Sequence, residues 1–288
     1  MTGRVVVGLD GSPASMAAAW WAAREATDRR LPVLLVHSWT TQPLDLPIPQ
    51  EAHAKRRYGR DLLRGTATEL RRRHPGLQLT TELVSEPAAQ TLLERAGDAS
   101  MLALGSRGQG SVASFLLGTI SLHVLGLAPC PAVAVRAGDP AVAAGEEHPA
   151  AADRHEVVVG LETTGPTAEP LLEFAFGAAG PRGARVRVVR ALPLSALFTE
   201  VDEDFATAER TRLTDALLPW REKFPDIPVV EYVTTGPAAQ VLLSASAHSG
   251  LTVVGRRRHP SHLTWKLGPV AHAVLHHLPC PVAVVPHD

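Results

Sequence analysis

Three glycines and a threonine near residue 110 have the spacing of a phosphate-binding loop. Gly105 and Gly108 are followed, after nine intervening residues, by Gly118 and Thr119. A short apolar run precedes the loop and a helix-like run follows it, so the loop is expected to join a buried strand to a helix. Glycine lets the backbone come close to a ligand. A helix N-terminus offers amide N–H groups and a positive dipole end, which suit a phosphate.

Two side chains of this loop can add to such a site. The Thr119 hydroxyl can donate a further hydrogen bond, and Arg107 can contact a phosphate as a cation. Two alternatives stay open: Arg107 can equally point into solvent, and the whole segment can be a glycine loop that holds no ligand.

The elements that must position this loop alternate between apolar strands and helices. The expected strands are residues 4–9, 32–38, 78–84, 101–104 and 131–135, and the expected helices are residues 13–30, 50–73, 87–96 and 118–125. Helices between apolar strands predict right-handed crossovers and a buried parallel sheet. Ligands of such sheets bind at the carboxyl ends of the strands. Asp10, Ser38 and Gly105 all follow strand ends, so we expect them to converge.

The second half of the chain repeats the first. Val5–Asp10 matches Val157–Glu162 at an offset of 152, and Glu86–Leu93 matches Gly236–Leu243 at an offset of 150. A repeat of this length indicates a domain duplication. We therefore expect two tandem doubly wound, Rossmann-like α/β domains, each with a mainly parallel five-stranded sheet. The predicted boundaries are a first domain at 1–137, a linker at 138–154 and a second domain at 155–288.

The second copy departs from the loop pattern. Gly255 is followed by Arg258 where the second glycine would stand, and Gly268 by Pro269 where the threonine would stand. Glu162 takes the place of Asp10. Proline removes an N–H from the helix start, so nucleotide binding by this copy is not expected. Two alternatives for Arg256–Arg258 are a site for a different anion and a solvated basic turn.

Composition excludes several classes of protein. The formal net charge of −1 gives no broad electrostatic case for nucleic acid. The apolar runs are too short to span a bilayer, and the N-terminus lacks the layout of a signal peptide, so a cytoplasmic location without membrane association is expected. Residues 1–138 contain 15 Lys and Arg against 11 Asp and Glu. This excess is weak support for a polyanionic ligand in the first domain.

The cysteines and histidines do not predict a metal site. Cys130 and Cys280 occupy equivalent places in the two halves, each beside a strand-like run, and are expected to be buried free thiols. A redox role is the alternative. His272 and His276 could share a helix face, but no further ligand is near, which favours packed or surface histidines.

The loop and its surroundings resemble the universal stress protein family. The pattern G-x-x-G-x9-G-[S/T] is that family's ATP-binding pattern, and Val5–Ser12 and Ala128–Val135 resemble its first and last strands. The resemblance implies ATP, with or without Mg²⁺, as the ligand of the first domain. It implies nucleoside contact by Asp10, backbone contact with adenine near Ser38, and phosphate contact by the loop. It also implies a pseudo-dimer of the two copies through their last strands, with a homodimer as a further possibility.

Three functions fit these observations. The favoured one is an ATP-binding, stress-responsive regulatory protein without catalytic residues. The second is a slow ATP hydrolase or phosphotransferase, although the chain has no G-x-x-x-x-G-K-[S/T] loop and the expected site offers no clear base. The third is an interaction protein that holds no nucleotide.

Overall fold

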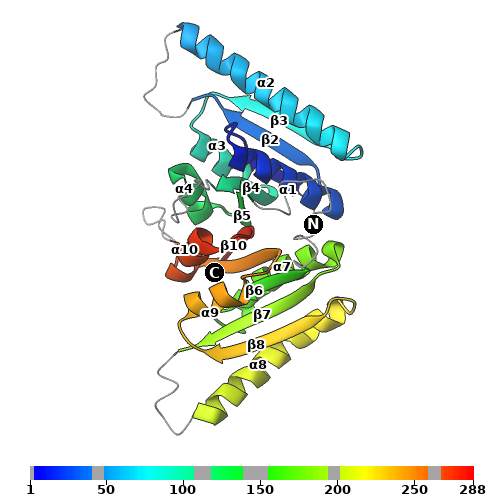
Figure 1. The fold of residues 1–288 in the computed structure, drawn as a ribbon, viewed down its shortest axis with the longest axis vertical. Coiled ribbons are helices and arrows are strands. Elements are labelled where there is room, and N and C mark those ends of the chain that lie inside the picture. Colours follow the sequence, from blue (N-terminus) through cyan, green and yellow to red (C-terminus); the bar gives the residue numbers. More distant parts are fainter. Residues whose placement is uncertain (1–2, 41–48, 107–117, 139–154, 194–201, 259–266) are drawn as a thin grey trace. The chain divides into compact units, whose positions relative to one another are not determined.

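The computed structural model divides the chain into two compact units, Met1–Gly145 and Glu146–Asp288 (Figure 1). It describes residues 3–40, 49–106, 118–138, 155–193, 202–258 and 267–288. The predicted linker therefore lies almost entirely outside the described residues. None of the helices in the described ranges combines the length and the apolar character needed to cross a bilayer.

The first unit alternates strands and helices as expected. Its strands are β1 (Arg4–Gly8), β2 (Val33–Ser38), β3 (Leu79–Val84), β4 (Ala99–Ser106) and β5 (Ala132–Arg136), and its helices are α1 (Pro13–Arg29), α2 (Pro49–Arg73), α3 (Ala88–Arg95) and α4 (Thr119–Leu127). The strands lie in the order β3-β2-β1-β4-β5, and all their pairings are parallel. The order reverses direction at β1, where Val5 pairs with Val33 on one side and Met101 on the other.

Both faces of this sheet carry helices, which makes the fold doubly wound. Helix α1 packs on β1, β4 and β5 beside α2, while α3 packs on β1 and β2 beside α4. Residues Val5, Val6 and Val7 of β1 are fully buried because both faces are covered. Helix α1 forms here because Ser12 caps it, Pro13 opens it and its alanines fit closely against the sheet.

The second unit has the same architecture. Its strands are β6 (Glu156–Gly160), β7 (Arg185–Leu192), β8 (Val229–Thr235), β9 (Leu251–Arg257) and β10 (Val282–His287), and its helices are α7 (Glu169–Arg182), α8 (Asp202–Lys223), α9 (Ala238–Ala245) and α10 (Pro269–His277). Its parallel strands lie in the order β8-β7-β6-β9-β10. The prediction of two α/β domains, each with a parallel five-stranded sheet, is confirmed.

The units differ where the first helix begins. In the first unit, four residues separate the end of β1 from the start of α1. In the second, a short 3₁₀ helix η1 (Pro166–Ala168) stands between β6 and α7, and α7 begins only at Glu169. No side chain caps η1 or α7. This later start changes the space at the carboxyl ends of the second unit's strands.

Candidate functional site

The end of β1 places Asp10 in a tight turn. Its Oδ1 accepts a hydrogen bond from the Ser12 amide at 2.9 Å, and its own amide donates to Ser15 Oγ at 3.3 Å. The side chain is exposed at the carboxyl edge of the sheet. Asp10 therefore supports the start of α1, while its position at the strand end also suits ligand contact.

Two side chains at the end of β2 form hydrogen bonds with backbone carbonyl groups of neighbouring segments. Ser38 Oγ contacts the carbonyl oxygens of Thr40 at 2.7 Å and Glu86 at 2.6 Å, which ties β2 to the turn before α3. His37 is buried, and its Nδ1 lies 2.7 Å from the Leu9 carbonyl. A carbonyl only accepts, so Nδ1 donates there. This bond ties the end of β2 to the end of β1.

Gly105 has a structural reason of its own. A Cβ atom at this position would lie 2.5 Å from the carbonyl carbon of Ala14 and the amide nitrogen of Ser15. Only glycine lets the end of β4 pass so close to the first turn of α1. On its other side, the Gly105 carbonyl accepts a hydrogen bond from Ser121 Oγ at 3.1 Å. That bond fixes the first turn of α4 against the end of β4.

Gly118 and Thr119 form the start of α4, as predicted. Gly118 is the N-cap with φ −60° and ψ 148°, and no side chain caps the first turn. A Cβ at Gly118 would meet none of the described residues within 4 Å, and Thr119 is exposed. Arg107 and Gly108 lie outside the described residues. The described parts of the predicted site, at the ends of β1, β2 and β4 and the start of α4, share one edge of the sheet.

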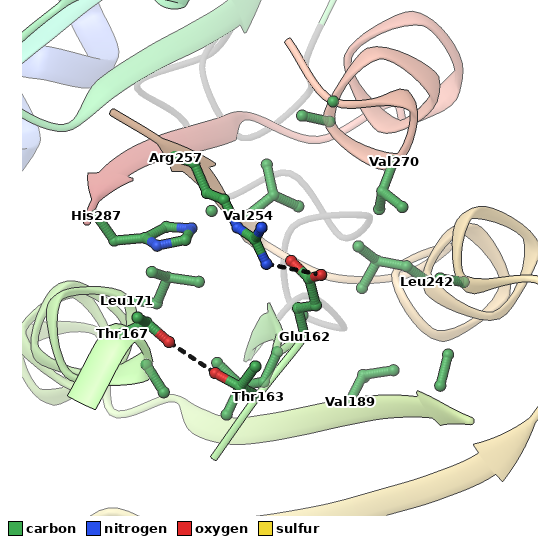
Figure 2. Close-up of a pocket in the computed structure, with 18 of the residues that line it drawn as sticks. Glu162, Thr163, Thr167, Leu171, Val189, Leu242, Val254, Arg257, Val270 and His287 are labelled. Carbon is green, nitrogen blue, oxygen red and sulfur yellow. Dashed lines mark hydrogen bonds and ion pairs between the residues drawn. The ribbon is translucent and has the colours of Figure 1, made fainter. Parts of the chain in front are cut away.

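The second unit contains a cavity at the equivalent edge, with a volume of about 520 Å³ (Figure 2). It lies among the ends of β6, β7, β9 and β10 and the first turns of η1, α9 and α10. Figure 2 shows its wall of aliphatic side chains, which comprises Leu171, Val189, Leu242, Val254 and Val270. A cavity of this size can hold a small organic molecule.

The start of the second loop is occupied by side chains. A Cβ at Gly255 would lie 2.8 Å from His287 Nε2 and 3.3 Å from Leu171 Cδ2. Gly105 thus packs against the backbone of α1, whereas the equivalent Gly255 packs against the side chains of His287 and Leu171.

The three consecutive arginines of the second loop do not form one cationic site. Arg256 is buried. Arg257 pairs with Glu162 at 3.0 Å and Arg258 with Asp288 at 3.4 Å. Arg257 and Arg258 are exposed, as in a solvated basic turn, whereas Arg256 is not.

One difference between the units was not predicted from the sequence. A side chain on the second strand differs between them, and so does the residue that packs against it. Val5 pairs with Val33 and Val157 with Val186, so His37 and Arg190 stand at corresponding places. Each supplies a donor to a backbone carbonyl at the end of the central strand, Leu9 for His37 and Glu162 for Arg190.

In each unit, the helix that packs against this side chain carries a residue that accommodates it. A Cβ at Gly59 of α2 would lie 2.6 Å from His37 Cδ2, so glycine leaves room for the ring. In α8, Glu209 pairs with Arg190 at 3.1 Å. A comparison of the two halves, position by position, could have found this signal.

Both cysteines are buried, as predicted, and two histidines of α10 lie on one face of that helix. Cys130 and Cys280 are buried free thiols. His272 and His276 lie side by side on α10, with ring centroids 4.3 Å apart. Within the described ranges, no group of three or more His, Cys, Asp or Glu residues could hold a metal ion.

Comparison with known proteins gives one family for both halves. The profile of the universal stress protein family matches residues 1–136 and 154–286. A universal stress protein of Mycobacterium tuberculosis is 33% identical over 97% of this chain and 96% of its own length. Another from Mycolicibacterium smegmatis is 28% identical over 98% of this chain and 96% of its own.

The fold is also that of solved structures. A universal stress protein from Archaeoglobus fulgidus superposes with a TM-score of 0.74 at 17% identity, covering 99% of this chain and 98% of that one. At this identity the match concerns the fold.

Proposed function

Since the chain belongs to the universal stress protein family, we propose that it is an ATP-binding regulatory protein of the stress response. ATP binds the first domain, at the carboxyl ends of β1, β2 and β4. Asp10 contacts the nucleoside, the backbone near Ser38 contacts adenine, and the loop from Gly105 to Thr119 holds the phosphates. Arg107 and Gly108 contribute to this loop, and Mg²⁺ accompanies the phosphates.

One observation supports this proposal above the others. The hydrogen bond from Ser121 Oγ to the Gly105 carbonyl holds the uncapped first turn of α4 against the end of β4. Amide groups of that turn are then directed at the space beside the strand end, where an anion is stabilised by the helix dipole.

The test of the site uses a pair of matched glycines. Gly118 and Gly268 are both N-caps with φ near −60°, and a Cβ at either position meets no described residue within 4 Å. Neither backbone requires glycine, so valine is accommodated in both. Gly118→Val should weaken ATP binding by about 2 kcal/mol or more, because the side chain crowds the phosphates. Gly268→Val should leave it unchanged.

Isothermal titration of the full chain should give one ATP site, lost in Gly118→Val alone. Two equal sites, or a folded Gly118→Val variant with unchanged affinity, would refute the assignment. If the wild-type chain binds no nucleotide, the third function, an interaction protein that holds no nucleotide, would be favoured.

We propose that the two domains associate as a pseudo-dimer through β5 and β10, and that a homodimer can form by the same surfaces. The support is the composition of these strands, which are short, valine-rich and the last in each domain, since edge strands of this kind pair readily when their backbone groups are unpaired. Separately produced domains should bind each other. Two soluble domains without mutual affinity would contradict the proposal.

A further inference from the structure

The cavity of the second domain is a site of its own, distinct from the proposed ATP site. It lies where η1 and the start of α7, rather than the first turn of α1, stand beside the ends of the strands. At Gly105, the nearest atoms to an added Cβ are helix backbone, whereas at Gly255 they are the side chains of His287 and Leu171.

The walls of this cavity are hydrocarbon. Leu242 lies against Gly160, where an added Cβ would approach its Cδ2 to 2.9 Å, so the strand end and the leucine form a continuous apolar floor. Leu171, Val189 and Val270 face the same space (Figure 2). Such a lining favours a ligand with an apolar body.

The charges that line the cavity cancel. Arg257 pairs with Glu162 at 3.0 Å, and Figure 2 shows this ion pair reaching across the ring of aliphatic side chains. Arg190 pairs with Glu209 and donates to the Glu162 carbonyl. Asp288, a further carboxylate of the lining, pairs with Arg258 at 3.4 Å. Among the described residues of the lining, a polyphosphate would meet no surplus positive charge, and an isolated cation would meet no surplus negative charge.

The polar groups that remain suit uncharged oxygen or nitrogen atoms. The hydroxyls of Thr163 and Thr167 lie 2.6 Å apart at the rim and can each donate or accept. The first turn of α10 starts with Pro269, which has no N–H, so only Val270 and Ala271 can offer amides from it. These groups can orient one hydroxyl, carbonyl or amine of a ligand.

We propose that the second domain binds a small uncharged molecule with an apolar, ring-sized body and one hydrogen-bonding group, and that it does so independently of ATP. The duplicated chain would thus hold two different ligands, a nucleotide in one copy and an apolar effector in the other.

The test uses N-phenyl-1-naphthylamine, an uncharged aromatic amine whose fluorescence rises in an apolar site. Val270 and Ile120 occupy equivalent places, one residue inside α10 and α4. Val270→Trp fills the cavity and should weaken binding of the probe by about tenfold or more, with ATP binding unchanged. Ile120→Trp, which adds the same side chain to the first domain, should leave probe binding intact.

A second cavity-filling variant, Ala191→Phe, approaches from the end of β7 and should have the same effect as Val270→Trp. It keeps the test valid if the first variant does not fold. The proposal is overturned if the full chain binds no probe, if neither folded cavity variant weakens it, or if ATP displaces the probe in proportion to its own binding.

Discussion

Asp10 can serve two purposes with one carboxylate. Its Oδ1 accepts from the Ser12 amide and so stabilises the turn before α1. The side chain is nevertheless exposed at the sheet edge where ligands of this fold bind. The two purposes respond differently to substitution, because an amide oxygen can replace the carboxylate in the turn but not in a contact that uses both oxygens.

Asp10→Asn should therefore keep the stability of the first domain and weaken ATP about tenfold, the effect of losing one hydrogen bond to a charged group. Isothermal titration and thermal unfolding measure the two effects separately. Glu162→Gln, the equivalent change in the second domain, is the control and should not affect ATP. Unchanged ATP affinity in Asp10→Asn would leave Asp10 as a turn residue only.

At the scale of elements, the two copies show how one helix start decides what a domain can hold. Helix α1 begins with a serine cap and a proline and fills the space beside β4. The equivalent helix of the second domain has no side-chain cap and begins later, and a cavity lies beside it. The difference in function that we propose for the copies follows from this difference in packing as much as from the loops.

Ser12→Ala should destabilise the first domain by about 1 kcal/mol, because the Ser12 hydroxyl accepts a hydrogen bond from the Ser15 amide at 3.2 Å. Thr164 stands at the equivalent position before η1, where no side chain caps the helix. Thr164→Ala should therefore change the free energy of unfolding much less. Urea unfolding of both variants gives the comparison, and equal losses would show that the cap is not what distinguishes the two starts.

The pairing of β7 with α8 predicts a pH dependence. Burial alone would raise the pKa of Glu209, but hydrogen bonds from Arg212 and Arg190 lower that pKa below its ordinary value of 4.5. A carboxylate with a lowered pKa stabilises the fold above its unfolded pKa, and this stabilisation is lost as the pH falls through the folded value.

Wild-type protein should thus lose stability relative to Glu209→Gln as the pH falls below about 4.5, since glutamine does not titrate. Urea unfolding of both proteins between pH 6 and about pH 3 measures the difference. If the free energies of unfolding of the two proteins change in parallel with pH across this range, the ion pairs of Glu209 do not stabilise the fold.

At the scale of the whole molecule, ATP is expected to act as a ligand that stabilises rather than as a substrate. The sequence offers phosphate-binding groups, but we identify no residue placed to activate water. Equal binding of ground and transition states gives no acceleration. A ligand that binds only the folded state raises the stability of the domain that holds it.

Purified protein with ATP and Mg²⁺ should turn over far more slowly than the ~1 s⁻¹ at the low end of common enzymes. ATP should raise the melting temperature of the first domain and leave that of the second unchanged. Turnover at ordinary enzymatic rates, abolished by Asp10→Ala or Thr119→Ala in folded protein, would favour the alternative of an ATP hydrolase.

The helices, the strands and the duplication could be predicted from the sequence alone. The strand predicted at 78–84 is Leu79–Val84, and the helix predicted at 118–125 is Thr119–Leu127. These features are readable because hydrophobic period, caps and turn residues act over a few neighbouring positions. The family also follows from such local motifs, and the sequence profile confirms it.

Which side chains and backbone segments pack at the ends of the strands could be seen only in the folded structure. Gly105 faces the backbone of α1, and the cavity of the second domain joins Glu162 to side chains from β9 and β10, about a hundred residues away. The sequence indicated that the second loop is altered but not that a cavity stands beside it. Close packing between distant segments depends on the shape of every neighbour at once, which no local pattern records.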